Sequence, residues 1–173
     1  MIKTQESALP EDVLIPHFGQ DATLVGVEIG TSGGVGCFGM LNRLPNLTMY
    51  TIDPFKHIDG SLHESSLPQE VLDEGYVLAL DRLSYFKGRV TVIRKASDDA
   101  VQDVPDVVDF VHIDGDHTYE QVIRDIDNYL PKIRKGGLIS GHDYILQAGV
   151  VRAVHERFKT VNFEQDYLWW VHV

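Results

Sequence analysis

The sequence predicts an α/β fold in which a mostly parallel sheet carries helices on both of its faces. Short, nearly continuous apolar runs recur along the chain, as in strands that are buried on both sides. Between these runs lie segments whose apolar residues follow a helical spacing. Alternating strands and helices form βαβ units, and the strands of such units are parallel.

The strands are expected where apolar runs end in glycine or in a polar residue. In chain order they are residues 24–29, 47–52, 90–93 and 107–113, a fifth that begins with 138–140, and a closing pair at 161–164 and 168–173. The first run ends in Glu28-Ile29-Gly30, the second is followed by Asp53-Pro54, and the fourth is followed by Asp114.

The helices are expected between these strands, through residues 38–44, 71–83, 97–104, 119–133 and 150–158. The clearest one contains Tyr119, Val122, Ile123, Ile126, Leu130 and Ile133. These positions follow the i, i+3, i+4, i+7 pattern of one apolar helix face. We expect Pro45 to end the first helix and Gly136-Gly137 to end the helix that begins at Tyr119.

Two segments stand outside this alternation. Residues 1–22 are expected to form an N-terminal helical segment. Residues 54–70 have no regular period, and we interpret them as a long loop. Loops of more than about 12 residues in compact domains are often lids or binding loops, so this segment is a candidate lid.

The composition favours a single domain that spans residues 1–173. The chain is 43% hydrophobic and 24% charged, which is ordinary for a single soluble core. The single cysteine, Cys37, cannot form an internal disulfide or a thiolate metal cluster. No apolar run approaches the ~18 residues that span a bilayer, and residues 1–20 lack a secretory signal pattern. We therefore expect a cytoplasmic protein without a membrane partner.

The charge balance disfavours nucleic acid as a partner. There are 15 basic and 26 acidic residues, which gives a formal net charge of −11. Proteins that bind nucleic acid take much of their affinity from basic side chains on phosphates. A small-molecule ligand fits this composition better.

Polar or glycine residues gather at the ends of five predicted strands. They are Glu28, Gly30, Asp53, Ser97, Asp114, His142 and Asp143. In open α/β sheets, ligands bind beyond the carboxyl ends of the strands, where the strand order reverses. The sequence therefore predicts a ligand site built from these residues, with Asp53 as an acceptor for ribose hydroxyls.

The glycine-rich turn after the first strand has several interpretations. Glycines there allow positive φ and close approach to a ligand, and Glu28 would place a carboxylate in the pocket. The turn is also compatible with a plain strand–helix connection. Gly34, Gly36 and Gly39 match the G-x-G-x-x-G dinucleotide fingerprint, with Asp53 following at suitable spacing. That pattern starts four residues after the strand end, which weakens the dinucleotide interpretation.

A second group of residues suits metal binding or proton transfer. Asp114 and Asp143 follow neighbouring strands, and His142 precedes Asp143. Two carboxylates and an imidazole can hold Mg²⁺ or Mn²⁺, and a neutral histidine can take a proton from a hydroxyl. By itself, Asp116 is better explained as a helix N-cap, and His112 as a core histidine.

Several segments together resemble a known family. They are 27–34 (VEIGTSGG), 51–54 (TIDP), 109–119 (DFVHIDGDHTY), 130–138 (LPKIRKGGL) and 141–144 (GHDY). In this order they resemble a class I S-adenosylmethionine-dependent methyltransferase, in a small branch related to the macrolide-sugar and aminocoumarin-sugar O-methyltransferases. The resemblance implies a three-layer Rossmann-like fold with a seven-stranded sheet whose last strand is antiparallel.

The resemblance also implies roles for individual residues. Gly30, Thr31, Ser32 and Gly33 would lie beside the methionine part of S-adenosylmethionine, with Glu28 at the base of that pocket. Asp53 would bind the ribose, and Ser97 would contact the adenine. Asp114 would line the cofactor site and, with Asp143, hold Mg²⁺ or Mn²⁺. His142 stands where a third acidic ligand is usual. His117 and Asp116 match positions that are catalytic in different relatives.

The resulting hypothesis is methyl transfer to a hydroxyl of a small molecule or sugar, with His117 and Asp114 as catalytic residues and possible assistance from a metal ion. Little of the chain remains to enclose an acceptor, so the acceptor site is expected to be an open cleft or an interface in a homo-oligomer. One alternative is a non-catalytic nucleotide-binding domain that docks on a partner through an exposed Trp169-Trp170 end. Another is an NAD-binding domain.

Overall fold

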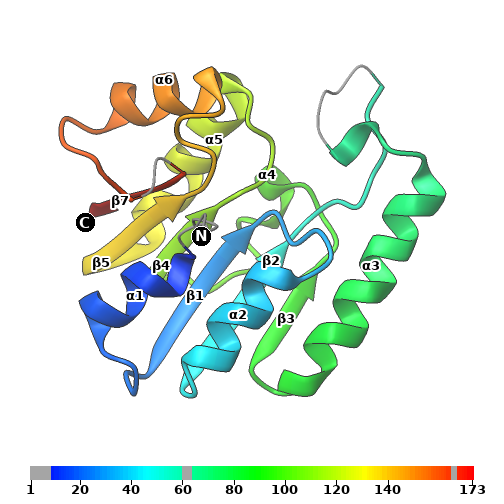
Figure 1. Ribbon diagram of the computed structural model, residues 1–173, viewed down its shortest axis with the longest axis horizontal. Helices are drawn as coiled ribbons and strands as arrows, with labels where there is room; N and C mark the ends of the chain where they lie inside the picture. Colours follow the sequence, from blue (N-terminus) through cyan, green and yellow to red (C-terminus); the bar gives the residue numbers. More distant parts are fainter. Residues whose placement is uncertain (1–8, 60–63, 165–166) are drawn as a thin grey trace, which may run out of the picture.

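A seven-stranded sheet forms the centre of the computed structural model, which describes residues 9–59, 64–164 and 167–173 (Figure 1). The strands are β1 (Leu24–Ile29), β2 (Leu47–Ile52), β3 (Val90–Ile93), β4 (Val108–Ile113), β5 (Ile133–Gly141), β6 (Asn162–Glu164) and β7 (Leu168–His172). Their order across the sheet is β3-β2-β1-β4-β5-β7-β6. The first five are parallel, and β7 is antiparallel to both of its neighbours. The predicted fold class is therefore confirmed.

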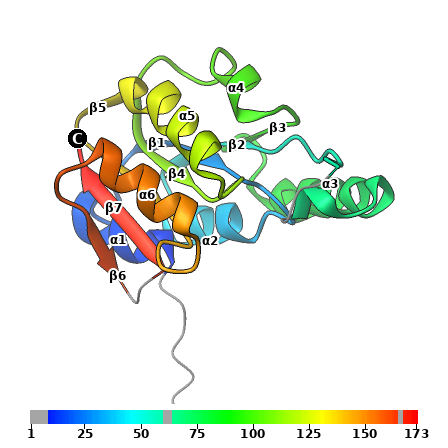
Figure 2. The same cartoon turned by 90° about the horizontal axis from the view of Figure 1, so that it is seen from above.

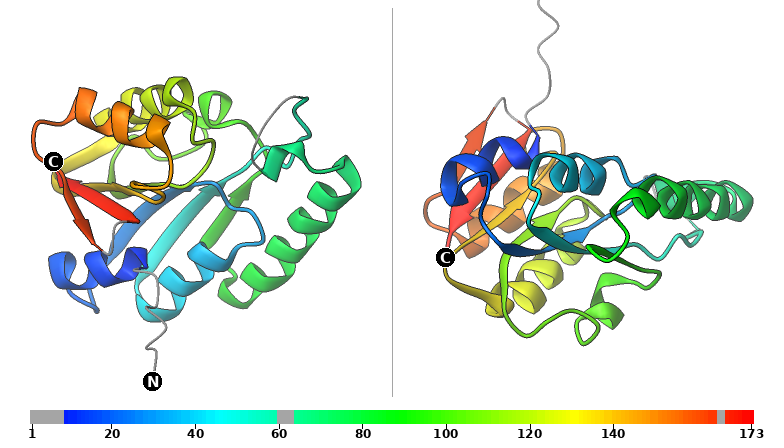
Figure 3. Two further views of the ribbon diagram at one scale, coloured as in Figure 1. Left: turned by 45° about the horizontal axis from the view of Figure 1, so that its top comes forward. Right: turned by 90° about the horizontal axis from the view of Figure 1, so that it is seen from below.

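The helices form a layer on each face of the sheet, as Figures 2 and 3 show. One layer contains α1 (Pro10–Phe18), α2 (Val35–Arg43) and α3 (Gln69–Leu83), and the other contains α4 (Ser97–Ala100), α5 (Tyr119–Tyr129) and α6 (Ala148–Arg157). Short 3₁₀ turns occupy Glu64–Ser66, Ser84–Phe86 and Leu130–Lys132.

Two hydrophobic cores lie on opposite faces of the sheet, and the alternation of side chains along each strand divides the residues between them. In β1, Leu24 packs into the core beneath α1 and α2, whereas Val27 and Ile29 pack into the core beneath α5 and α6. Glu28 follows the same alternation and therefore points toward the α1–α2 side. This direction matters for the site.

The boundary between the helix at Tyr119 and the fifth strand differs from the prediction. The helix α5 ends at Tyr129, and β5 already begins at Ile133. Pro131 lies in the 3₁₀ turn between them, and a proline cannot continue the helical hydrogen bonding. Gly136 lies inside β5 with φ of 77°, and the pairing of β5 with β4 shifts register here. The glycines thus accommodate a strand irregularity instead of ending a helix.

The two segments outside the predicted alternation are only partly regular. The expected N-terminal helical segment contains α1, while residues 1–8 lie outside the described residues. In the candidate lid, residues 53–58 have no regular structure and a 3₁₀ turn spans Glu64–Ser66. Residues 60–63 of this loop lie outside the described residues. Gln69, predicted as part of the loop, begins α3.

The C-terminal tryptophans are not the exposed surface that partner docking would require. Trp169 is completely buried and packs on Phe158, with ring centroids 6.3 Å apart. Trp170 is only half-buried and pairs with Ser140 of β5. Within the described ranges, no helix has the length and apolar character needed to cross a membrane.

Candidate functional site

The candidate site lies at the carboxyl ends of β1 and β4, which are neighbours although they are distant in sequence. Gly30 follows β1 with φ of 100°, and its backbone packs against that of Asp114. A Cβ at Gly30 would lie 2.5 Å from the carbonyl carbon of Asp114 and would overlap its oxygen. The turn after β1 and the end of β4 are therefore in direct contact, at the point where strand order reverses.

Backbone strain gathers at this edge of the sheet. Among the described residues, the non-glycine residues with positive φ are Ser32 (45°), Phe55 (46°) and Asp143 (55°). They follow β1, β2 and β5, respectively. Such conformations cost on the order of 1–3 kcal/mol each and concentrate at ligand-binding sites. Their common location supports a ligand site at this edge.

Asp53 connects the turn after β1 to the loop after β2. One carboxylate oxygen accepts a hydrogen bond from the backbone N–H of Ser32 at 3.0 Å, and the other accepts one from Phe55 at 2.8 Å. A carboxylate can accept several hydrogen bonds at once through its two oxygens. This capacity fits the two hydroxyls of a ribose.

Glu28 lies behind the glycine turn and does not line the open edge, contrary to the expectation that it would place its carboxylate in the pocket. It is 2% exposed, and its Oε2 accepts a hydrogen bond from the Thr51 hydroxyl at 2.5 Å. Burial is the main cause that raises the pKa of Glu28 to about 8; the charges of Asp114 and Asp53 act in the same direction. Burial therefore favours the neutral form of the Glu28 carboxyl group.

The G-x-G-x-x-G pattern is explained by packing. Gly34 is the N-cap of α2, and Gly36 and Gly39 lie inside that helix. A Cβ at Gly36 would lie 2.7 Å from the carboxylate of Glu28, and one at Gly39 would lie 2.9 Å from that of Glu11. These glycines make room for two buried acidic side chains on the protein side of α2. The dinucleotide interpretation thus loses its main support.

Ser97 lies at the start of α4, beyond the end of β3, and is 8% exposed. Its hydroxyl donates to Asp125 at 2.6 Å, and its carbonyl accepts from Tyr129 at 2.7 Å. The side chain is thus turned toward α5. Any contact with a ligand at this edge would come from the backbone at the start of α4.

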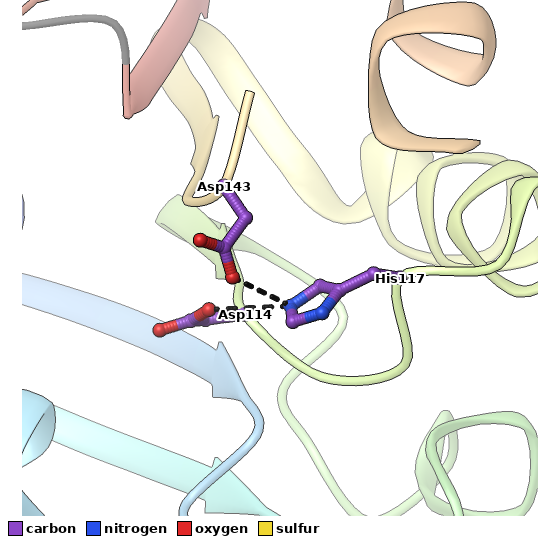
Figure 4. A group of neighbouring side chains, drawn as sticks. All are labelled: Asp114, His117 and Asp143. Carbon is purple, nitrogen blue, oxygen red and sulfur yellow. Dashed lines mark ion pairs between the residues drawn. The ribbon is translucent and has the colours of Figure 1, made fainter. Parts of the chain in front are cut away.

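Three side chains converge where β4 and β5 end (Figure 4). The Nε2 atom of His117 lies 3.2 Å from Asp143 Oδ2 and 3.6 Å from Asp114 Oδ1. One ligand atom from each residue lies within 4.8 Å of the others, which is compatible with a shared metal ion. An imidazole nitrogen and two carboxylate oxygens form a donor set that divalent cations such as Mn²⁺ and Mg²⁺ can use.

His142 and Asp116 lie beside this cluster and have other contacts. The Nδ1 of His142 is 3.5 Å from the second oxygen of Asp143, and its ring stacks on Tyr167 with centroids 6.1 Å apart. Asp116 accepts a hydrogen bond from the backbone N–H of Thr118 at 2.7 Å, but Thr118 itself is the N-cap of α5. The structure brings Asp114 and Asp143 together as predicted, but the histidine that lies between them is His117 and not His142.

The carboxylates determine the charge of His117. Burial by itself would lower the pKa of His117, but the hydrogen bond to Asp114 and the charges of Asp143, Asp114 and Asp116 outweigh burial and raise it. The neighbouring acids thus favour a positive charge at the centre of the cluster, supplied by a protonated imidazole or by a bound cation.

Sequence reasoning missed Thr51, which links Glu28 to the glycine turn. Its hydroxyl lies 2.7 Å from that of Thr31 and 2.5 Å from Glu28. The one available signal was its position in β2, where alternation places Thr51 on the same buried face as Leu47 and Met49. A threonine at such a position needs a polar partner.

Comparisons with solved structures show where this fold recurs. The O-methyltransferase NovP shares 21% sequence identity at a TM-score of 0.63, over 94% of this chain and 75% of that one. An rRNA methylase from Streptococcus thermophilus shares 13% identity (TM-score 0.63), over 93% and 92% of the two chains. A precorrin 8W decarboxylase from Methanobacterium thermoautotrophicum shares 14% (TM-score 0.66), over 96% and 92%. At these identities the likeness concerns the fold.

Comparison with protein families is more decisive. A search of curated proteins gives no match to this chain. The family model described as a methyltransferase domain (Methyltransf_24) matches residues 27–144, which is more than half of the 173 residues. The matched region runs from β1 to the residue after Asp143 and so includes the whole edge described above. The chain therefore belongs to this family of methyltransferase domains, whose methyl donor is S-adenosylmethionine.

Proposed function

We propose that this protein transfers the methyl group of S-adenosylmethionine to a hydroxyl oxygen of a small molecule. The observation that carries the proposal is the convergence of Asp114, His117 and Asp143 directly beside the glycine turn. A methyltransferase that acts on a hydroxyl needs a group that receives the hydroxyl proton close to the donor methyl. This cluster is that group in the proposal.

The cofactor is assigned to the turn and the adjoining strand ends. Gly30, Thr31, Ser32 and Gly33 are proposed to border its methionine part, and Asp53 is proposed to bind the ribose hydroxyls. The adenine is proposed to lie toward the start of α4, near the backbone of Ser97. This order places the sulfonium end beside Asp114, because the turn contacts the end of β4.

The reaction is an in-line displacement. The acceptor oxygen attacks the methyl carbon, the carbon–sulfur bond breaks, and its electron pair stays on sulfur, which leaves S-adenosylhomocysteine. Holding the two molecules in line can contribute about 7–11 kcal/mol to the lowering of the barrier. The hydroxyl proton passes to the cluster of Asp114, His117 and Asp143, and proton transfer of this kind adds roughly 10²–10⁴-fold.

The same three residues would hold a divalent cation through His117 Nε2 and one oxygen from each carboxylate. When bound, such a cation would lower the pKa of a coordinated acceptor hydroxyl. Without it, a neutral His117 would take the hydroxyl proton, and Asp114 and Asp143 would stabilise the imidazolium that forms.

The charge of the edge supports a small-molecule acceptor over nucleic acid. Asp53, Asp114, Asp116 and Asp143 all lie at or near the carboxyl ends of the strands, and the chain has a net charge of −11. A phosphate backbone would be repelled there. Next to Asp143, the side chains of Ile145 and Leu146 are 55% and 59% exposed. We propose that they contact an apolar part of the acceptor.

Replacing Leu146 with serine should raise the KM for the acceptor about tenfold and leave the KM for S-adenosylmethionine unchanged. The acceptor would no longer bury a leucine side chain, and that burial contributes on the order of 1.5 kcal/mol. Steady-state kinetics with each substrate varied in turn measures both constants. Val107→Ser is the matched control, since Val107 is 64% exposed and precedes the amino end of β4.

Binding of S-adenosylhomocysteine tests the donor half of the proposal. At about 100 times its Kd, this product should stabilise the fold by roughly 2.7 kcal/mol and raise the Tm, whereas NAD should have no effect. Calorimetric titration with both ligands gives the affinities directly. A Tm shift with NAD alone would mean that the donor site has been misassigned.

Transfer of a radiolabelled methyl group to hydroxyl compounds tests the acceptor half. Matched phenols, sugars and amines separate O-methylation from N-methylation. Label that enters only amines, or only RNA, would overturn the proposed acceptor class while leaving the donor assignment intact.

A further inference from the structure

We propose that Glu28 is a positioning residue for the cofactor and acts on the glycine turn through the hydroxyls of Thr51 and Thr31. The inference rests on the donor half of the proposed function and is independent of the acceptor and of any metal ion. It replaces a direct contact between Glu28 and the cofactor by an indirect one that passes through two buried side chains.

The side chains of Glu28, Thr51 and Thr31 are connected by consecutive hydrogen bonds, which we call the Glu28–Thr51–Thr31 relay. Thr51 donates to Glu28 Oε2 at 2.5 Å, and the two threonine oxygens lie 2.7 Å apart. All three residues are at most 3% exposed. A threonine hydroxyl has one proton. Because Thr51 donates to Glu28, it can only accept from Thr31, so the Thr31 hydroxyl is directed inward.

The relay fixes the part of the turn that is proposed to border the methionine moiety. Thr31 is held at its side chain by Thr51 and at its carbonyl by the N–H of Gly34, at 2.8 Å. The next residue, Ser32, has a strained φ of 45° and donates its N–H to Asp53. The backbone from Gly30 to Gly33 is thus held at Thr31 by the relay and at Ser32 by Asp53.

The surroundings of Glu28 explain why an uncharged acid suits this role. Acidic groups face it from three sides: Asp114 after β4, Asp53 after β2 and Glu11 on α1. The other titratable neighbours are Cys37 on α2 and His112, which pairs with Glu28 across β1 and β4. Burial leaves no water to solvate a charge, and Gly36 leaves space for the side chain. A neutral carboxyl can still accept the bond from Thr51.

The experiment measures S-adenosylhomocysteine affinity and folding stability in parallel for variants of the relay. Thr51→Val and Glu28→Met should each raise the Kd about tenfold, the equivalent of one hydrogen bond. In the double variant the Kd should rise no further, because either change already interrupts the relay. Glu28→Gln should restore the affinity to within about threefold of wild type, since its amide oxygen accepts from Thr51.

Thr48→Val is the control, because Thr48 lies on the same strand and alternation places its side chain on the other face. It should leave the Kd unchanged. If Thr51→Val does not fold, Thr31→Val and Thr31→Ser provide the same comparison, with the serine expected to retain binding. Variants that lose stability but bind S-adenosylhomocysteine as tightly as wild type would overturn this inference and leave the donor assignment intact. Failure of the wild-type protein to bind would overturn the donor assignment as well.

Discussion

Replacing Gly30 with alanine is expected to abolish cofactor binding and to lower the free energy of unfolding by about 2–5 kcal/mol. The added Cβ would lie 2.9 Å from the backbone nitrogen of Gly115 and closer still to the carbonyl group of Asp114. Those atoms belong to the backbone at the end of β4 and cannot rotate away. The residue would also have to keep φ near 100°, which L side chains rarely adopt.

Gly88→Ala separates the two causes. Gly88 has φ of 89°, and a Cβ there would have no atom within 4 Å, so only the backbone cost of about 1–2 kcal/mol should appear. Urea denaturation gives the stabilities, and calorimetric titration with S-adenosylhomocysteine gives the affinities. If both alanine variants lose the same stability and both bind the ligand, the close contact between the turn and β4 is unimportant for the site.

Removing the imidazole of His117 should lower turnover by roughly 10²–10⁴-fold while the affinity for S-adenosylhomocysteine changes little. His117 Nε2 lies between Asp114 and Asp143, so His117→Ala removes the group that joins the two carboxylates. The measurement is kcat with a hydroxyl acceptor identified by label transfer. His172→Ala is the control, because His172 pairs with Leu138, away from the carboxyl end of β5. Full turnover by His117→Ala would exclude a catalytic role for this side chain.

Treatment with a chelator distinguishes two mechanisms: assistance by a bound divalent cation, and removal of the hydroxyl proton by the His117 imidazole alone. If a divalent cation assists, EDTA should abolish the activity of the wild-type protein, and Mn²⁺ or Mg²⁺ should restore it. If the imidazole itself takes the proton, activity should survive chelation and still depend on His117. Activity that survives both chelation and His117→Ala would place proton removal elsewhere.

Much of the sheet was predictable because buried parallel strands have a simple signature. The runs at 24–29, 47–52 and 90–93 coincide with β1, β2 and β3, and each ends where the chain must turn. The end of α5 was not predictable from periodicity, since Leu130 and Ile133 continue the helical pattern beyond it. The helix ends where it does because Pro131 cannot continue it and because Ile133 pairs with Val108 of β4. That pairing is a tertiary contact, which periodicity along the chain does not reveal.

The candidate site was predictable at the level of strand ends but not of individual contacts. Parallel strands bring their carboxyl ends to one edge of the sheet, so Asp53, Asp114 and Asp143 had to lie along that edge. The depth of Glu28 depends on the packing of α2 against β1, which spacing along the chain does not reveal. The choice of His117 over His142 depends on the turn after β4, where two residues separate Asp114 from His117.

The glycines of α2 show how a sequence fingerprint can arise from a different requirement. Gly36 and Gly39 lie on the inner surface of α2, and the space left by their missing side chains is filled by the buried Glu28 and Glu11. These glycines therefore do not form a surface that faces a diphosphate. A pattern search detects only the spacing of the glycines and is blind to what occupies the space they leave. In homologues, we expect these positions to vary together with the size of the two acids. Enlarging Gly39 while shortening Glu11 would then erase the fingerprint and leave the choice of ligand unchanged.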